Sequence, residues 1–110
     1  MASGNSGLEM PSFPAIYSMN YGISVGAVDI NNNMARFSNK SGNYFLDYVT
    51  APGVNIFSTV PNDGYAFYSG TSMAAPHVAG IAALLKSHDK GLTTNEIESL
   101  IIGSGSNNNY

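Results

Sequence analysis

The sequence contains no cysteine and no tryptophan, and only 10% of its 110 residues are charged. Without cysteine there is no disulfide and no thiolate metal site, and cysteine usage favours neither an oxidising nor a reducing compartment. Four basic and seven acidic residues give a net charge of −3 with no basic cluster, which argues against nucleic acid as a partner. No apolar run reaches membrane-spanning length, so we expect no membrane partner either.

The hydrophobic content of 44% is ample for a packed core, so the chain is not of the disordered type. Its length allows one domain at most, at the lower end of the usual range. The scarcity of charge is unusual for a free-standing domain. We therefore expect most segments of this chain to lie in the interior of a larger body.

Short apolar runs separated by turn signals predict an α/β fold. Residues 23–29, rich in small and β-branched side chains, suit a parallel strand covered on both faces. Residues 46–51 and 55–60 form further strands, and the turn at residues 61–64 returns the chain antiparallel over 65–68. The polar residues 36–42 are expected to form a surface turn.

Two helices are predicted in the second half of the chain. Residues 72–86 are apolar on every side, which indicates a central, buried helix rather than an amphipathic one. Thr93 and Glu96 form a capping-box pattern at the start of a short outer helix. Residues 103–110 are expected to be a polar, frayed tail.

One stretch places a small hydroxyl residue, Ser72, directly at the start of the buried helix. There the unpaired amides and the positive end of the helix dipole favour negative charge, which a nucleophilic serine needs when its attack creates an oxyanion. The competing interpretation is an ordinary helix N-cap, the usual role of such a residue. The full string favours the nucleophile: Gly70-Thr71-Ser72-Met73-Ala74-Ala75-Pro76-His77-Val78-Ala79-Gly80.

This string resembles the nucleophile segment of subtilisin-like serine proteases. The resemblance implies a three-layer α/β fold with a mostly parallel sheet around a central buried helix, of which residues 1–102 form the C-terminal portion. It also implies an endopeptidase that cleaves peptide bonds through an acyl-enzyme on Ser72. The chain resembles about the last two-fifths of such a domain, and 51–54, Ala-Pro-Gly-Val, match at the corresponding place.

The opening loop resembles the family's oxyanion-hole loop, and Asn5 corresponds to the asparagine that donates to the developing charge. The alternative for this loop is a flexible N-terminus or a simple turn. Removing such a donor costs roughly 100- to 1000-fold in rate, a magnitude taken from an enzyme of this family. The resemblance further implies that the backbone of Ser3 and Gly4 lines the primary specificity pocket and that the Phe13–Pro14 bond is cis.

The remaining titratable residues offer no catalytic partner for Ser72. His77 lies five residues further along the helix, about 140° away around its axis, so we assign it a packed, hydrogen-bonded structural role. His88 is expected to be solvated in a turn beyond the helix. Asp47 matches an aspartate near a weak cation site in some relatives, but ordinary solvation is the favoured interpretation, and no metal ligands are assigned.

In this family the catalytic aspartate and histidine precede the asparagine loop, at which this chain begins. The resemblance therefore implies that an upstream N-terminal part of the domain is a partner, and that these 110 residues alone do not turn over substrate. It implies no cofactor for the chemistry, room for a structural calcium ion in the complete domain, a peptide or protein substrate, and an extracellular or cell-envelope location. The alternative is a catalytically incompetent homologue that holds a peptide or serves in assembly.

Overall fold

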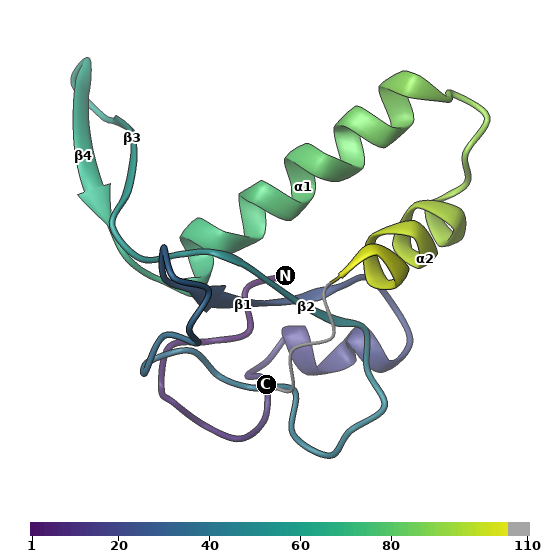
Figure 1. Ribbon diagram of the computed structural model, residues 1–110, viewed down its shortest axis with the longest axis horizontal. Coiled ribbons are helices and arrows are strands. Elements are labelled where there is room, and N and C mark those ends of the chain that lie inside the picture. The colour runs from purple at the N-terminus through teal and green to yellow at the C-terminus, as the bar shows by residue number, and fades with distance from the viewer. Residues whose placement is uncertain (106–110) are drawn as a thin grey trace.

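The computed structural model describes residues 1–105, and its centre is a short parallel sheet (Figure 1). Strand β1 (Ser24–Val28) pairs in parallel with β2 (Tyr48–Pro52), and all five residues of β1 are buried. The first residues of the chain extend this sheet, because Ala2 forms a parallel bridge with Val25. The opening segment is therefore anchored beside β1, and the flexible N-terminus considered above is wrong.

The predicted hairpin is confirmed. Strands β3 (Ile56–Val60) and β4 (Gly64–Tyr68) pair antiparallel. Asn62 and Asp63 have φ angles of 66° and 55°, the left-handed conformation that a tight hairpin turn requires. In Figure 1 the hairpin projects from the body of the molecule, at the end of the sheet where helix α1 begins.

Helix α1 (Thr71–His88) packs on the sheet through one face. Ala74 and Val78 are buried against the core, whereas Ile81 and Leu84 are 48% and 72% exposed. The all-round burial expected from the helix composition is therefore not realised within residues 1–105. A helix that is apolar on every side needs neighbours on every side, and the sheet and α2 cover only one.

Helix α2 (Thr94–Ser104) begins with the predicted capping box: Thr93 Oγ1 accepts from the Glu96 amide, and the Glu96 carboxylate accepts from the Thr93 amide. Ile101 of this helix is buried and Ile97 and Ile102 pack against the core, while its polar face lies on the outside, as predicted. The helix includes Gly103 and Ser104. The boundary predicted at residue 103, where a frayed tail was expected to begin, is therefore too early. Residues 106–110 of that tail lie outside the described residues.

The core is formed where α1, α2 and the sheet meet, and it consists of Ile23, Val25, Ala27, Ala35, Ala51, Ala74, Val78 and Ile101. A one-turn 3₁₀ helix, η1 (Ala15–Met19), follows the Phe13–Pro14 bond, which is cis as the resemblance implies. Among residues 1–105 no helix is long and apolar enough to cross a membrane.

The prediction that residues 36–42 lie in a surface turn is wrong for the buried residues at the centre of this segment. Ser38 is 2% exposed and Asn39 is fully buried. Both are polar, but each finds hydrogen-bond partners in segments that are distant in the sequence, and burial of a fully bonded polar group costs little.

Candidate active site

Ser72 lies in the first turn of α1 and is exposed to solvent. The N-cap of the helix is Gly70, without a side-chain cap, so the interpretation of Ser72 as an ordinary N-cap is wrong. As the second helical residue, Ser72 has a backbone N–H with no carbonyl partner inside the helix. Hydroxyl and amide thus lie together at the positive end of the helix dipole.

The opening loop meets this helix start through Asn5. Its Oδ1 atom accepts a hydrogen bond of 2.8 Å from the Thr71 amide and one of 2.9 Å from the Thr71 hydroxyl. Thr71 is fully buried, and its Oγ1 atom also accepts from the Gly4 amide at 3.2 Å. Asn5 is therefore fixed to the residue that immediately precedes Ser72, although the two segments are separated by 66 residues.

These contacts also orient the Asn5 amide. Because Oδ1 is occupied by Thr71, the Nδ2 group is the donor that is left, and within residues 1–105 no hydrogen bond engages it. A Cβ atom placed on Gly70 would lie 3.4 Å from this Nδ2, which is van der Waals distance, so Nδ2 lies beside the N-cap of α1. A side-chain N–H donor and the Ser72 amide therefore flank the same helix start.

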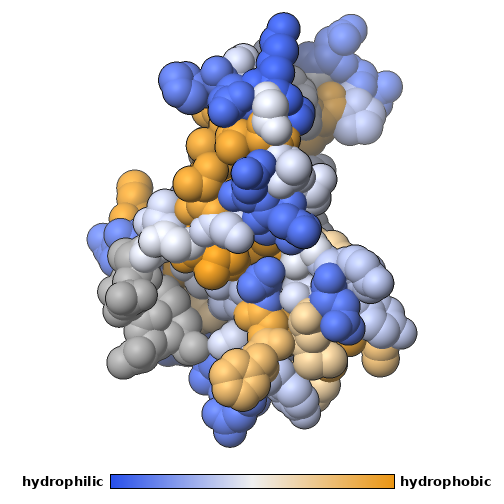
Figure 2. Space-filling view, turned by 90° about the vertical axis from the view of Figure 1, so that its right-hand side faces the viewer, coloured by the Kyte–Doolittle hydropathy of each residue, from blue (hydrophilic) through white to orange (hydrophobic). Residues whose placement is uncertain are grey.

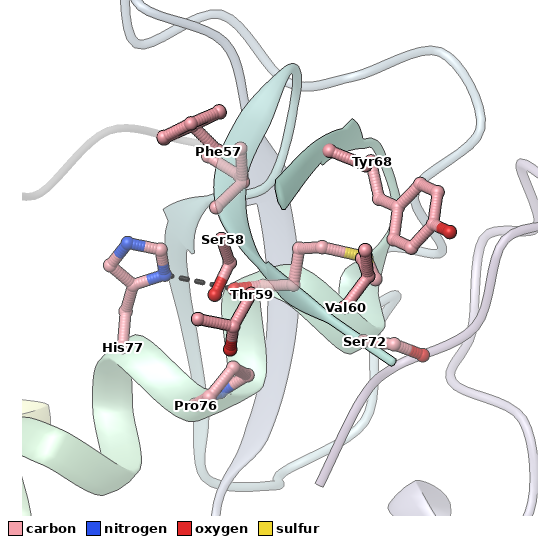
Figure 3. A pocket seen from close by; sticks show the side chains of 11 residues that line it. Phe57, Ser58, Thr59, Val60, Tyr68, Ser72, Pro76 and His77 are labelled. Carbon is pink, nitrogen blue, oxygen red and sulfur yellow. Dashed lines mark hydrogen bonds between the residues drawn. The ribbon is translucent and has the colours of Figure 1, made fainter. Parts of the chain in front are cut away.

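A cavity of about 390 Å³ opens beside Ser72, between the start of α1 and the hairpin (Figure 3). Strand β3, Tyr68 and Met73 contribute to its lining, together with His77. In Figure 3 His77 and Ser72 lie on opposite sides of this cavity, and the His77 Nδ1 atom is 2.8 Å from the Met73 carbonyl oxygen.

The histidines thus behave largely as predicted. His77 is hydrogen-bonded to its own helix and makes no bond to Ser72, but it is exposed and not packed. His88 is exposed, as expected, but it is the last residue of α1 and does not lie in a turn beyond the helix. Among residues 1–105 neither histidine is hydrogen-bonded to Ser72.

Ser3 and Gly4 are held firmly by the surrounding loops. Ser3 is fully buried, with its amide bonded to the Val25 carbonyl and its own carbonyl accepting from the Ser12 amide. Gly4 adopts a φ of 112°, and a Cβ atom at this position would lie 2.5 Å from Nδ2 of Asn39. The position therefore requires glycine. That their backbone lines a specificity pocket stays a prediction.

The acidic residues do not gather into a metal-binding cluster within residues 1–105. Asp47 is half-buried and lines a surface cavity together with Asn95 and Glu98. Among residues 1–105 no group of three or more histidine, aspartate and glutamate side chains could hold a metal ion.

Two structural residues of this site escaped sequence reasoning. In the sequence Thr71 is recognisable only as a member of the motif, but in the structure its hydroxyl joins Gly4 to Asn5. Asn39 falls within the predicted surface turn, but in the structure it is bonded to the opening loop. Its carbonyl accepts from the Tyr48 hydroxyl at 2.7 Å, and burial raises the pKa of that phenol while hydrogen bonds with Ser38 and Ser3 lower it in part.

Comparison with known proteins finds relatives of a single family. A family model described as the subtilase family matches residues 1–109. The chain is 46% identical to Subtilisin BL of Lederbergia lenta over 113 residues, covering 99% of this chain and 40% of that protein. It is 47% identical to Alkaline elastase YaB of Bacillus sp. (strain YaB) over 106 residues, covering 96% of this chain and 27% of that protein.

Solved structures show the same likeness. A cold adapted subtilisin-like serine proteinase superposes with a TM-score of 0.81 at 37% identity, covering 93% of this chain and 36% of that one. The Prenylagaramide maturation protease PagA gives a TM-score of 0.83 at 35% identity, covering 98% of this chain and 40% of that one. The chain thus spans between about a quarter and two-fifths of the length of these relatives.

Proposed function

The chain belongs to the subtilase family, and from that membership we propose that it carries the nucleophile of a serine endopeptidase. Ser72 is the nucleophile in this proposal, and Asn5 Nδ2 and the Ser72 amide are the two donors of the oxyanion hole. The observation that carries the proposal is the pair of bonds from Thr71 to Asn5 Oδ1, which leaves the Nδ2 donor group beside Ser72 without a bond to any other part of residues 1–105.

The reaction follows from these groups. The Ser72 Oγ atom forms a bond to the carbonyl carbon of a peptide, and a histidine takes the hydroxyl proton. The carbonyl oxygen becomes negative and accepts hydrogen bonds from Asn5 and from the Ser72 amide, which lowers the barrier because both donors are fixed before the reaction begins. The C–N bond then breaks, the amine leaves with the proton, and water hydrolyses the acyl-enzyme on Ser72.

The histidine and the aspartate that orients it come, in this proposal, from an N-terminal part of the same domain. Ile81 and Leu84 on the uncovered face of α1 support this, since apolar side chains of that size are normally buried. Figure 2 shows apolar surface in the middle of the face on which α1 and α2 lie. The proposed domain acts on peptides outside the cell or in its envelope, uses no cofactor for the chemistry, and has its specificity pocket lined by Ser3 and Gly4.

The test is a chimaera with Subtilisin BL. This chain replaces the matching 40% of that protein, and the rest of Subtilisin BL supplies the N-terminal part. We expect Ser72 to be labelled by a fluorophosphonate and a peptide substrate to be cleaved with a burst of acylation. The Ser72→Ala chimaera is the matched control, and it should lose labelling completely. Cleavage that survives this substitution, or a Ser72 that stays unlabelled in a folded chimaera, would refute the assignment.

The isolated chain should be inactive in the same assays. Without a base, the oxyanion donors retain only roughly 10³- to 10⁴-fold of acceleration over water. Turnover by the isolated chain at the rate of the chimaera would contradict the proposed division of the machinery. A folded chimaera that binds peptide but leaves Ser72 unlabelled would instead favour the incompetent homologue.

A further inference from the structure

The buried side chain of Asn39 is connected to the opening loop on both sides of Asn5. Its Oδ1 atom accepts from the Ser6 and Leu8 amides, each at 3.0 Å. Its own backbone amide donates to the Gly4 carbonyl at 2.9 Å. Gly4 and Ser6 are the neighbours of Asn5, so each of the two peptide groups that flank Asn5 is bonded to Asn39.

The other end of the Asn39 amide fixes the base of the loop. Nδ2 donates to the Ser3 carbonyl at 3.2 Å and to the Ser12 hydroxyl at 2.9 Å. The Asn39 side chain thus makes four hydrogen bonds, which exhausts the capacity of a primary amide. Such a fully bonded and fully buried amide has one orientation available to it.

Asn39 is itself held from the opposite side. Its carbonyl oxygen accepts from the hydroxyl groups of Ser3, Ser38 and Tyr48 at 3.0, 3.3 and 2.7 Å. Ser38 in turn accepts from the amide of Ala27 in the middle of β1. Through Asn39 and Ser38, hydrogen bonds therefore connect the opening loop to strand β1 of the buried sheet.

From this arrangement we infer that Asn39 is a positioning residue for the oxyanion hole. It holds the backbone on both sides of Asn5, while Thr71 holds the Asn5 side chain, so that Nδ2 stays where the negative oxygen develops. The inference rests on the proposed function of Asn5 and Ser72. Displacing such a donor by an ångström is enough to weaken it severely, because the donor acts only at the position of the oxyanion.

The loop should survive the loss of the Asn39 side chain. Three backbone bonds remain between the two segments: Asn39 N–H to Gly4 O, Gly7 N–H to Phe37 O, and Lys40 N–H to Leu8 O. Asn39→Ala therefore loosens the loop without removing it. Asn39→Asp keeps an oxygen for the Ser6 and Leu8 amides, and its second oxygen, protonated in so buried a site, can still donate one hydrogen bond to the Ser3 carbonyl or the Ser12 hydroxyl, so its effect should be intermediate.

A double-mutant cycle with Asn5→Ala in the chimaera tests the inference. With Asn5 present, Asn39→Ala should lower kcat by roughly 10- to 100-fold, with KM changed little, because the lost interaction is made in the transition state. In the Asn5→Ala background the same substitution should change kcat by less than about threefold, since no side-chain donor is left to misplace. Ser24→Ala is the matched control, because Ser24 is as fully buried as Asn39 but its hydroxyl has no hydrogen-bond partner among the described residues, and it should stay within about threefold in both backgrounds.

Equal losses in both backgrounds, or a loss confined to KM, would overturn the inference and leave Asn39 a general structural residue. If the Asn39→Ala chimaera does not fold by circular dichroism, Asn39→Asp takes its place in the same cycle and is judged by the same criterion. Fluorophosphonate labelling of the unsubstituted chimaera separates the two proposals. A labelled Ser72 without coupling refutes the role of Asn39 alone, whereas an unlabelled Ser72 refutes the proposed function and this role together.

Discussion

Two segments flank Ser72, and different interactions hold them in place. We call them the opening-loop wall, which carries Asn5, and the hairpin wall, which is formed by β3 and β4. The loop that carries Asn5 is tied by side-chain hydrogen bonds to Asn39 and Thr71, both fully buried. The β3–β4 hairpin is held by its own ladder and by a stack of exposed aromatic rings, with Phe57 lying 5.4 Å from Tyr65 and 4.9 Å from Phe67 between ring centroids.

This difference shows which side of the site has a geometry that is fixed by contacts within this chain. Buried, saturated polar contacts define one arrangement, because every alternative leaves a donor or an acceptor without a partner. Exposed aromatic contacts are worth less and permit several arrangements. The opening-loop wall, which holds the Asn5 donor, is therefore preformed. The hairpin wall, by contrast, is stabilised little by the rest of the chain.

The largest effect is expected from a methyl group added to the preformed wall. In Gly4→Ala, the new Cβ would lie 2.5 Å from Asn39 Nδ2 and 2.6 Å from Ser12 Oγ, at a φ of 112°. We expect a loss of about 3 kcal/mol in the free energy of unfolding, since overlap and backbone strain combine. Denaturant unfolding of the chain measures it.

The control for this substitution is Gly80→Ala on α1, where an added Cβ meets no atom within 4 Å. That change should stabilise the chain by up to about 1 kcal/mol, because alanine favours the helix. A Gly4→Ala chain as stable as the original would show that the wall is not rigid.

A smaller effect, dependent on pH, is expected at Tyr48. Loss of its bond to the Asn39 carbonyl in Tyr48→Phe should cost about 1 kcal/mol of stability at neutral pH. Burial raises the pKa of this phenol, so the neutral form is favoured by folding, and its contribution is complete below the unfolded pKa of about 10. The contribution is lost as the pH rises through the higher folded pKa.

The difference in unfolding free energy between the original chain and Tyr48→Phe should therefore shrink above about pH 10. Urea unfolding at neutral and at alkaline pH measures it. A difference that stays constant across that range would mean that the folded structure does not discriminate between the two forms of the phenol.

The smallest effect on global stability is expected at the hairpin. Phe57→Ser removes two ring contacts from a side chain that is 59% exposed, and should cost less than about 1 kcal/mol. Amide hydrogen exchange should nevertheless accelerate over β3 and β4 and stay unchanged at Ser6 and Leu8. Faster exchange at those two amides would show that the two walls are coupled.

The local patterns of the sequence predicted the elements well. The hairpin turn at Asn62 and Asp63, the parallel strands and the capping box at Thr93 all depend on residues close together in the chain. Each has a physical signature within a few positions, such as turn chemistry or a side-chain reach of three residues. These features could be predicted without any knowledge of the tertiary structure.

The errors concern contacts between distant segments. A polar Asn39 among polar neighbours resembles a surface residue, and only its partners more than 25 residues away explain its burial. The exposure of Ile81 and Leu84 likewise depends on which elements lie next to α1. The identity of Ser72 and Asn5 as candidates came from motif resemblance, whereas the role of Thr71 in joining them required coordinates.

The bond between Asn5 and Thr71 closes a loop of 66 residues. During synthesis the opening loop leaves the ribosome long before the helix that orients its amide, and the segment that bears Asn39 emerges between them. A product terminated ahead of residue 71 therefore lacks the donor pair altogether, however well its strands have formed. Closing so long a loop costs chain entropy before the contact adds any stability, which is why pairings between such distant segments slow folding.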